Sequence, residues 1–410
     1  MTGPPSRGPA TVRLEQDDAR CVAFEAAVRM HASFEGAPSL VLDRSAFYPE
    51  SGGQLADLGA LDVLDGASPP WSIAVRDVQI DAEGWVHHLV EGPLPSVDAR
   101  VKGRIDPGRR RLHTALHTAQ HMLSRALLEL GAGETVSSRL GASGCTIDLD
   151  RDGLSEARLA EAESLVQALI DEDRPVRAWF PELEELAALP LRRAPKAEHA
   201  RVRVVDVQGF DVSPCGGTHV LHTSEIGVVR MLSSQRYKGG TRIVFSAGGR
   251  ARGELRAAHD TLEAVARALG VPAAEALAST GRLQAQLEAL GTELGRTRGA
   301  LAHALAQGGG PGLLWLGEGG VELVRQVAAL RSRDAEGMAV VAGPVEGGVH
   351  LVVARGPRGE GDARVVWARL AAAGEGRGGG RPERVEGRFV VAEGELGALR
   401  ARLELAVSAG

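Results

Sequence analysis

Short runs in which apolar and polar residues alternate fill the first hundred positions of the chain. The runs 39–42, 71–75 and 85–90 are typical of strands, and turn residues separate them. Several short strands at this spacing predict a small β-barrel, which we place in residues 1–105. The first ten residues are rich in Pro and Gly, and we expect them to be disordered.

The spacing of apolar residues changes from that of strands to that of helices in the next part of the chain. Residues 109–130 are rich in Leu and Ala without Gly or Pro, which predicts a helix, and 156–173 has an amphipathic helical pattern. We expect strands around these helices at 137–149, 202–207, 227–233 and 243–247. This combination predicts an α+β domain over residues 106–250.

A helical arm is predicted for residues 251–310. Leucines recur there at a spacing of three and four, which fits a coiled-coil dimer seam as well as a helix packed on its own domain. A Gly-rich linker follows at 308–312. Buried strands at 338–342 and 350–354, with helices at 364–373 and 393–406, then predict an α/β domain over 311–410. The overall fold class is therefore α+β.

Composition limits the classes of protein that the chain can represent. The 410 residues carry a formal net charge of −6 and three Cys, and no apolar run is long enough to span a membrane. We therefore expect a cytoplasmic protein without disulfides, and we see no signal peptide. A nucleic-acid partner would have to bind local basic clusters, which are equally compatible with solvated faces. The candidate nucleic-acid-binding residues are Arg110, Arg111, Lys238, Arg242, Arg377 and Arg381.

Histidines and one cysteine suggest a metal site. His113, His117 and His121 are four residues apart, so they form a row on one face of the predicted helix, and adjacent members can hold one metal ion. Far along the chain, Cys215 and His219 flank a Gly-Gly turn, after which we expect a strand. Imidazole and thiolate together suit zinc, although a row of His can also be an ordinary core edge.

Longer strings of residues resemble a known family. Ser45-Ala-Phe-Tyr-Pro-Glu-Ser-Gly-Gly-Gln54 resembles the glycine motif of the alanyl-tRNA synthetase editing domain and of the free-standing AlaX trans-editing proteins. His117-Thr-Ala-Gln-His121 and Cys215-Gly-Gly-Thr-His219 resemble the two halves of their zinc site. Gly376-Arg-Gly-Gly-Gly-Arg-Pro382 is similar to the glycine signature of the DHHA1 domain, although it also fits a disordered surface loop. The order of these parts resembles the long form, AlaX-L.

The resemblance implies roles for particular residues. It makes His117, His121, Cys215 and His219 the ligands of one zinc ion per chain, with His113 as a lesser candidate. Ser45 stands where the family usually has Thr, and it would recognise the hydroxyl that distinguishes serine from alanine. Gln54 would be its polar neighbour, and Gly52 and Gly53 would let the 3′ end of the substrate approach the bare backbone, unless they form a plain hairpin turn.

The function implied by the resemblance is hydrolysis of a mischarged ester. The substrate would be tRNA(Ala) carrying serine, and glycine is a second candidate amino acid. Two alternatives remain open: a tRNA-binding protein with a structural zinc and no turnover, and a metal-dependent hydrolase of small esters. A homodimer through the helical arm or the C-terminal domain also remains open, and no membrane partner is expected.

Overall fold

The computed structural model describes residues 10–64, 71–195, 201–308, 310, 312–392 and 394–409. The chain divides into two compact units, Met1–Leu262 and Glu263–Gly410, which are described separately. Nearly all of the segment expected to be disordered, and two residues of the expected Gly-rich linker, lie outside the described residues. The four-part division expected from the sequence remains a prediction. In the described part of the chain, no helix has the length and apolar character that a membrane span requires.

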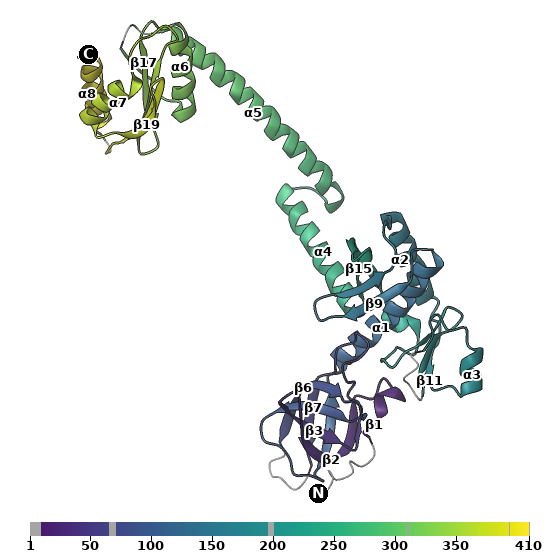
Figure 1. Cartoon of the computed structure of the whole chain (residues 1–410). Coiled ribbons are helices and arrows are strands. Elements are labelled where there is room, and N and C mark those ends of the chain that lie inside the picture. The colour runs from purple at the N-terminus through teal and green to yellow at the C-terminus, as the bar shows by residue number, and fades with distance from the viewer. Residues whose placement is uncertain are drawn as a thin grey trace. The chain divides into compact units, whose positions relative to one another are not determined.

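The first unit begins with a closed barrel, as the alternating pattern predicted (Figure 1). Its interior is filled by alternate apolar side chains such as Leu40, Leu42 and Leu61, all fully buried. A short parallel pair, β1 (Val12–Arg13) with β4 (Arg44–Ser45), lies beside it. The six strands, in their order around the barrel, are β2 (Ala23–Phe34), β3 (Ala37–Leu42), β7 (Val86–Glu91), β6 (Ser72–Ile80), β5 (Gly59–Val63) and β8 (Arg100–Ile105).

The His-bearing helix is α1 (Pro107–Glu129), close to the predicted bounds. Asp106 caps its N-terminus by accepting hydrogen bonds from the backbone N–H groups of Gly108 and Arg109, and Pro107 occupies the first turn. Most of the helix is buried, and its apolar side chains, including Leu116, Met122 and Leu123, enter the core of an α+β layer. The helix therefore starts at the edge of the barrel and continues into the next core.

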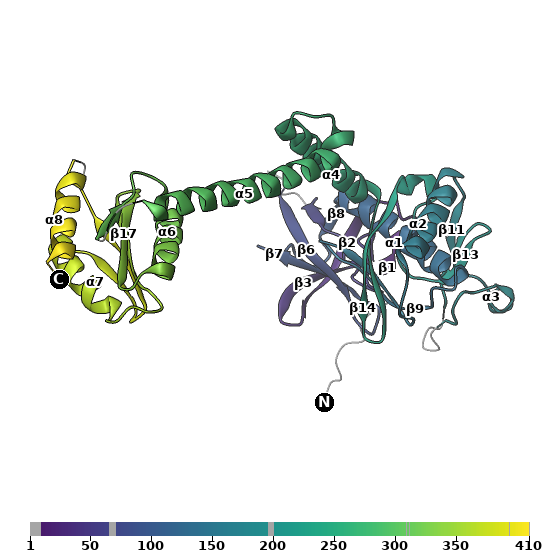
Figure 2. The same ribbon diagram turned by 90° about the horizontal axis from the view of Figure 1, so that it is seen from above.

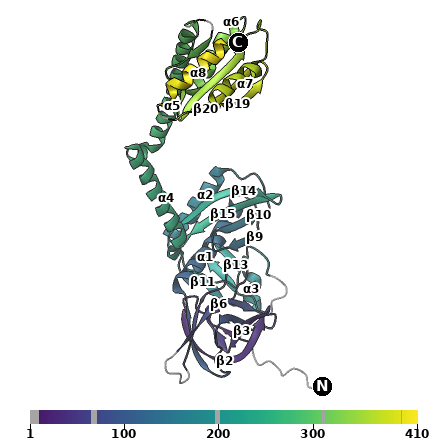
Figure 3. The same cartoon turned by 90° about the vertical axis from the view of Figure 1, so that its left-hand side faces the viewer.

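Two antiparallel sheets complete this layer, and α2 packs beside the larger one (Figure 3). The larger sheet has the order β14 (Val229–Tyr237), β15 (Gly240–Ala247), β10 (Cys145–Leu149) and β9 (Thr135–Leu140). The smaller sheet contains β11 (Val176–Trp179), β12 (Val204–Val207) and β13 (Asp211–Pro214). The helices are α2 (Glu156–Asp171), α3 (Leu183–Ala188) and α4 (Gly248–Leu269), which crosses the boundary between the units.

Two expectations for this layer were wrong. The run 137–149 is a hairpin and not one strand, because the Gly-containing turn 141–144 reverses the chain. No strand follows Cys215 and His219 directly; the chain instead forms a 3₁₀ turn at Thr223–Ile226. This irregular path has consequences for the site, since it lets the segment lie along α1.

The second unit is a five-stranded sheet with helices on both faces (Figure 2). Helix α6 covers one face together with the end of α5, while α7 and α8 cover the other. The Gly-rich run for which a disordered surface loop was one of two interpretations is the exposed edge strand β19, because its alternate glycines, such as Gly378 and Gly380, lie against β20 where a Cβ would not fit. The elements are α5 (Ala276–Gln307), β16 (Leu313–Trp315), α6 (Gly320–Asp334), β17 (Met338–Val345), β18 (Gly348–Arg355), α7 (Ala363–Gly374), β19 (Arg377–Arg381), β20 (Arg384–Val390) and α8 (Leu396–Ser408).

Candidate metal centre and its pocket

Four side chains from two distant segments meet in the first unit. His117 and His121 lie one turn apart on α1, and Cys215 and His219 lie in the segment that follows β13. Their donor atoms are all within 4.8 Å of one another, and the Sγ atom of Cys215 is 3.4 Å from Nε2 of His117 and 3.3 Å from Nε2 of His219. Tetrahedral zinc with its usual bond lengths separates nitrogen and sulfur ligands by about 3.3–3.6 Å. The donor set could therefore hold one metal ion.

Each imidazole of this group is fixed from behind at its Nδ1 atom. His117 donates to Oε1 of Gln54 at 2.7 Å, His121 to Oδ2 of Asp211 at 3.3 Å, and His219 to Oγ1 of Thr118 at 3.2 Å. Because these oxygens accept the Nδ1 proton, the three Nε2 lone pairs remain free for an ion. Partners of this kind fix the orientation of a metal-binding histidine.

One polar face of α1 organises the surrounding segments. Thr114 Oγ1 donates to the carbonyl of Arg110 and lies 3.2 Å from Oγ1 of Thr218, and one turn later Thr118 accepts from the backbone N–H of Val220. Gln54 joins the same network, since its Nε2 donates to Oγ1 of Thr218 and its Oε1 accepts from the backbone N–H of Thr218. The barrel loop, the helix and the Cys-containing segment thus share one hydrogen-bonded junction.

The charges of the group favour a metal-binding state. Burial alone would raise the pKa of the Cys215 thiol, but the three surrounding imidazoles outweigh burial and lower it well below its usual value. Burial lowers the pKa of His219 to about 3, so this ring is neutral at pH 7. Burial also opposes protonation of His121, but Cys215 and Asp211 together raise its pKa. A thiolate among imidazoles is the form in which such side chains bind zinc.

Two glycines are explained by close packing at the site. A Cβ atom on Gly217 would lie 2.1 Å from Cε1 of His117, so only glycine fits between the Cys-containing turn and the ring. Gly53 has a φ of +86°, and a Cβ there would lie 2.4 Å from the carbonyl oxygen of Ser138 on β9. Gly52 has no atom within 4 Å of such a Cβ and lines an open pocket. Of the two glycines expected to admit a substrate, Gly52 faces free space and Gly53 is used to dock the loop on β9.

A pocket of about 730 Å³ lies next to the metal-binding group. His117, His121 and Cys215 form part of its wall, and no Asp or Glu is among its described lining residues. Its charged lining consists of arginines from several segments: Arg13, Arg192, Arg193, Arg201 and Arg203. The guanidinium of Arg201 also lies 4.7 Å from the ring centre of Phe180, another lining residue. Such a pocket attracts an anion, and an aromatic ring beside it could stack with a base.

Sequence reasoning did not identify these arginines. Arg13 lies on β1, and the other four come from the segment between α3 and β12. Residues 192–203 of that segment contain five Lys and Arg residues, and this basic cluster was the local signal that could have identified them. Arg203 is 6% exposed and donates to the carbonyls of Cys215 and Gly217, which supports the turn that carries two of the potential ligands.

Ser45 and Gln54 are both buried in the structure. Gln54 supports His117 as described above. Ser45 lies in the barrel wall, where its hydroxyl donates to Nε2 of His88 at 2.7 Å and accepts from the backbone N–H of Phe47. Its side chain is fully buried and is not part of the pocket lining. The expected contact between Ser45 and a substrate hydroxyl has no support in this geometry.

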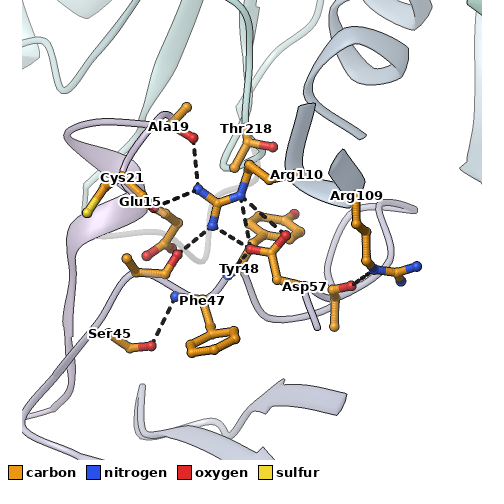
Figure 4. Close-up of polar contacts among 12 residues, drawn as sticks. Glu15, Ala19, Cys21, Ser45, Phe47, Tyr48, Asp57, Arg109, Arg110 and Thr218 are labelled. Atoms are coloured by element: carbon orange, nitrogen blue, oxygen red, sulfur yellow. Dashed lines mark hydrogen bonds and ion pairs between the residues drawn. The ribbon is translucent and has the colours of Figure 1, made fainter. Parts of the chain in front are cut away.

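The structure contradicts the prediction that Arg110 faces nucleic acid. Its side chain is 2% exposed, and its guanidinium forms an ion pair with the equally buried Asp57 (Figure 4). The remaining N–H groups donate to the carbonyls of Ala19 at 2.8 Å, Cys21 at 3.3 Å and Ala46 at 2.5 Å. Arg110 therefore joins α1 to three segments of the barrel half, and it has no donor left for a phosphate.

The other predicted basic residues occupy different environments. Arg111, Lys238, Arg377 and Arg381 are exposed. Arg242 forms a bidentate pair with Asp148, at 2.7 and 2.8 Å, and its guanidinium stacks on Tyr237. It is therefore largely committed to contacts within the protein.

His113 stays apart from the metal-binding group. It lies one turn before His117 on α1, is 2% exposed, and its Nδ1 has no hydrogen-bond partner among the described residues. Burial, together with the nearby Arg109 and Arg250, lowers its pKa to about 4. His113 is therefore neutral at pH 7, and its donor atoms are not among the four that converge.

Sequence comparisons connect this site with known proteins. The family described as the threonyl and alanyl tRNA synthetase second additional domain matches residues 202–244, which include Cys215 and His219. The alanine–tRNA ligase of Halorubrum lacusprofundi is 32% identical over 308 residues, which is 73% of this chain and 32% of that protein. The alanine–tRNA ligase of Methanothrix thermoacetophila is 32% identical over 403 residues, which is 92% of this chain and 42% of that protein.

The chain thus spans about a third of the length of the first curated relatives that it matches. A solved structure, the C-Ala domain of Aquifex aeolicus alanyl-tRNA synthetase, matches 24% of the chain at 17% identity with a TM-score of 0.21, which is too low to show a shared fold. The sequence matches nonetheless show a protein related to alanyl-tRNA synthetases and similar to their editing domain.

Proposed function

We propose that the chain hydrolyses the ester between a wrong amino acid and the 3′ ribose of tRNA(Ala), with serine as the main wrong amino acid and glycine as a second. The observation that carries this proposal is the convergence of the four donors, three of which lie in the wall of an arginine-lined pocket with no carboxylate among its described lining residues. The end of a tRNA is polyanionic and carries the ester, so it matches both parts of the site. The sequence relationship to alanyl-tRNA synthetases supports the same substrate.

His117, His121, Cys215 and His219 would hold one zinc ion, since their donor chemistry and spacing fit it. When bound, zinc would supply a Lewis acid and a fixed point for orienting the ester or its amino group. The protein's own contribution is position. Gln54, Asp211 and Thr118 hold the three imidazoles, and exposed Gly52 leaves one wall of the pocket without side chains.

The remaining parts of the chain would bind the body of the tRNA or a second copy. We assign residues 1–105 and 106–250 to the hydrolytic half, 251–310 to a helical arm and 311–410 to a DHHA1-like domain. Arg377 and Arg381 lie on the exposed strand β19, on the same face as Arg384 and Arg388, which suits a phosphate backbone. Leu287 and Leu290 of the arm are 70% and 62% exposed within one chain, which suits a homodimer.

Deacylation of three esters of tRNA(Ala) tests the proposal. We expect the seryl ester, and more slowly the glycyl ester, to be lost much faster than the alanyl ester. Cys215→Ala should abolish this activity and lower the bound zinc from one ion per chain to nearly none. His222→Ala is the matched control, because His222 lies near His219 in sequence but is about half exposed and outside the metal-binding group. Equal loss of all three esters, or full activity of zinc-free Cys215→Ala, would overturn the proposal.

A second candidate function is a tRNA-binding protein with a structural zinc. Four protein donors complete a tetrahedral shell, which is typical of zinc sites that support a fold. This alternative predicts tight binding of tRNA(Ala) without turnover of any of its esters. The deacylation assay separates the two functions, because only the first predicts loss of the seryl ester from the bound tRNA.

A further inference from the structure

Asp211 is shared between the metal-binding group and the pocket. Its carboxylate is 1% exposed, and its Oδ2 accepts from Nδ1 of His121 at 3.3 Å and from the hydroxyl of Ser213 at 2.9 Å. Its Oδ1 accepts from Nε of Arg192 at 2.7 Å, and Oδ2 also lies 3.4 Å from Nη2 of Arg192. The carboxylate of Asp211 therefore interacts with both the guanidinium of Arg192 and the imidazole of His121.

Arg192 is the member of this cluster that also faces the pocket. Its side chain is only 9% exposed, yet it belongs to the lining beside Arg193 and Arg203. Nε and Nη2 are used by Asp211, whereas Nη1 has no hydrogen-bond partner among the described residues. A guanidinium offers donors on more than one edge, so Arg192 can bind an anion in the pocket while it keeps part of its contact with Asp211.

We propose that Arg192 couples an RNA phosphate bound in the pocket to the metal affinity of His121 through Asp211. The identity of the anion rests on the function proposed above, while the coupling rests on the shared carboxylate. A phosphate that approaches Arg192 draws part of its positive charge away from Asp211. Asp211 then accepts more strongly from His121 Nδ1, and the Nε2 lone pair of His121 becomes a better metal ligand. Arg192 and Asp211 are thus positioning residues, since they act through His121.

The sign and size of the effect follow from this chain of contacts. RNA in the pocket should tighten zinc binding, and zinc should tighten RNA binding by the same factor, because coupling between two binding sites is reciprocal. Coupling of this kind is typically worth a factor of about 5 to 150, and we expect the lower end because Arg192 keeps contact with Asp211. Loss of the carboxylate itself should lower zinc affinity by about 10- to 100-fold, as is usual for groups that orient a metal ligand.

Zinc affinity of the full chain, measured by competition with a chelator, tests the proposal. The measurement is made with and without a short RNA that reproduces the 3′ end of tRNA(Ala) and carries no amino acid. In the wild-type chain the RNA should lower the zinc dissociation constant about fivefold. In Arg192→Gln this factor should fall to about one, although zinc still binds. Asp211→Asn keeps the shape of the side chain and should both weaken zinc binding and remove the coupling. This variant tests the coupling independently if Arg192→Gln misfolds.

Arg193→Gln is the matched control. Arg193 lines the same pocket, but its one hydrogen bond among the described residues is with the carbonyl of Pro214 at 3.5 Å and not with Asp211. This variant should bind RNA more weakly and still show the coupling when RNA is saturating. An unchanged zinc affinity in the wild type with RNA bound, coupling that persists in Arg192→Gln, or coupling lost in Arg193→Gln would each overturn the inference. None of these measurements involves an ester, so a chain that couples but does not deacylate would refute only the proposed function, and RNA that fails to bind would refute both.

Discussion

Removal of the buried guanidinium of Arg110 should loosen the junction between the barrel and α1. Arg110→Met leaves the carboxylate of Asp57 1% exposed and without its counter-ion, and it removes the donors of three main-chain carbonyls. Breaking a buried ion pair from one side costs about 3–5 kcal/mol. We expect the upper part of this range, because the carbonyls also lose their partners and each such loss costs on the order of 1 kcal/mol.

Hydrogen exchange followed by mass spectrometry suits this prediction, because it reports each segment of a chain that contains two units. The protected amides of α1 and of the barrel should exchange roughly one thousand to several thousand times faster in Arg110→Met, since every 1.4 kcal/mol is a factor of ten. Peptides of the second unit should exchange at their original rates.

Arg104→Met is the control within the same barrel. Arg104 forms a bidentate pair with Asp62, at 2.6 and 2.8 Å, but its side chain is 54% exposed. A surface pair of this kind contributes little, so exchange should change by no more than about threefold. Equal and small changes in the two variants would refute the view that Arg110 holds the two parts together. A fully protected α1 in Arg110→Met would refute it as well.

Three further predictions concern the barrel and the site. Burial lowers the pKa of His88 to about 4, below its usual value near 6.5, so the unfolded state binds the proton more tightly than the folded state. The contribution of His88 to the unfolding free energy should therefore be complete above about pH 6.5 and fall by about 3 kcal/mol towards pH 4. Thermal melts of His88→Gln should lack this pH dependence. Gly217→Ala should lose its bound zinc because the new Cβ would collide with His117, whereas Gly216→Ala, where no atom lies within 4 Å, should retain it; equal zinc contents would contradict this. Ser45→Ala should lower the unfolding free energy by about 1–3 kcal/mol, since a buried hydrogen-bond partner of His88 is lost. The same variant should leave the ratio of the seryl to the alanyl deacylation rate unchanged. A tenfold change in that ratio would restore Ser45 as a substrate contact.

The elements that could be predicted from the sequence are those decided by local patterns. The barrel strands and α1 follow from periods of two and of about four residues. Spacing alone gave a row of three His on α1, and the family resemblance selected His117 and His121 to join Cys215 and His219. A helical row of His depends only on spacing within one turn, so its geometry was accessible without the fold.

The elements that could not be predicted depend on partners far along the chain. Arg110 looks like a surface cation until Asp57 and Ala19, which lie 53 and 91 residues away, surround it in the fold. The same is true of Asp211, whose bond to His121 spans 90 residues. The edge strand β19 could not be told from a disordered loop, because its glycines suit flexible segments and the local pattern does not show the neighbouring strand that orders them.

His117 and Cys215 are 98 positions apart in the sequence, which determines when the metal-binding group can assemble during synthesis of the protein. During synthesis α1, which carries His117 and His121, leaves the ribosome long before the thiol of Cys215 is translated. A half-built cluster with two nitrogen donors would hold an ion only weakly. If the group binds zinc as proposed, the ion would therefore bind late, after the barrel loop, the helix and the distant turn have come together, and it would have to be supplied to a nearly mature protein.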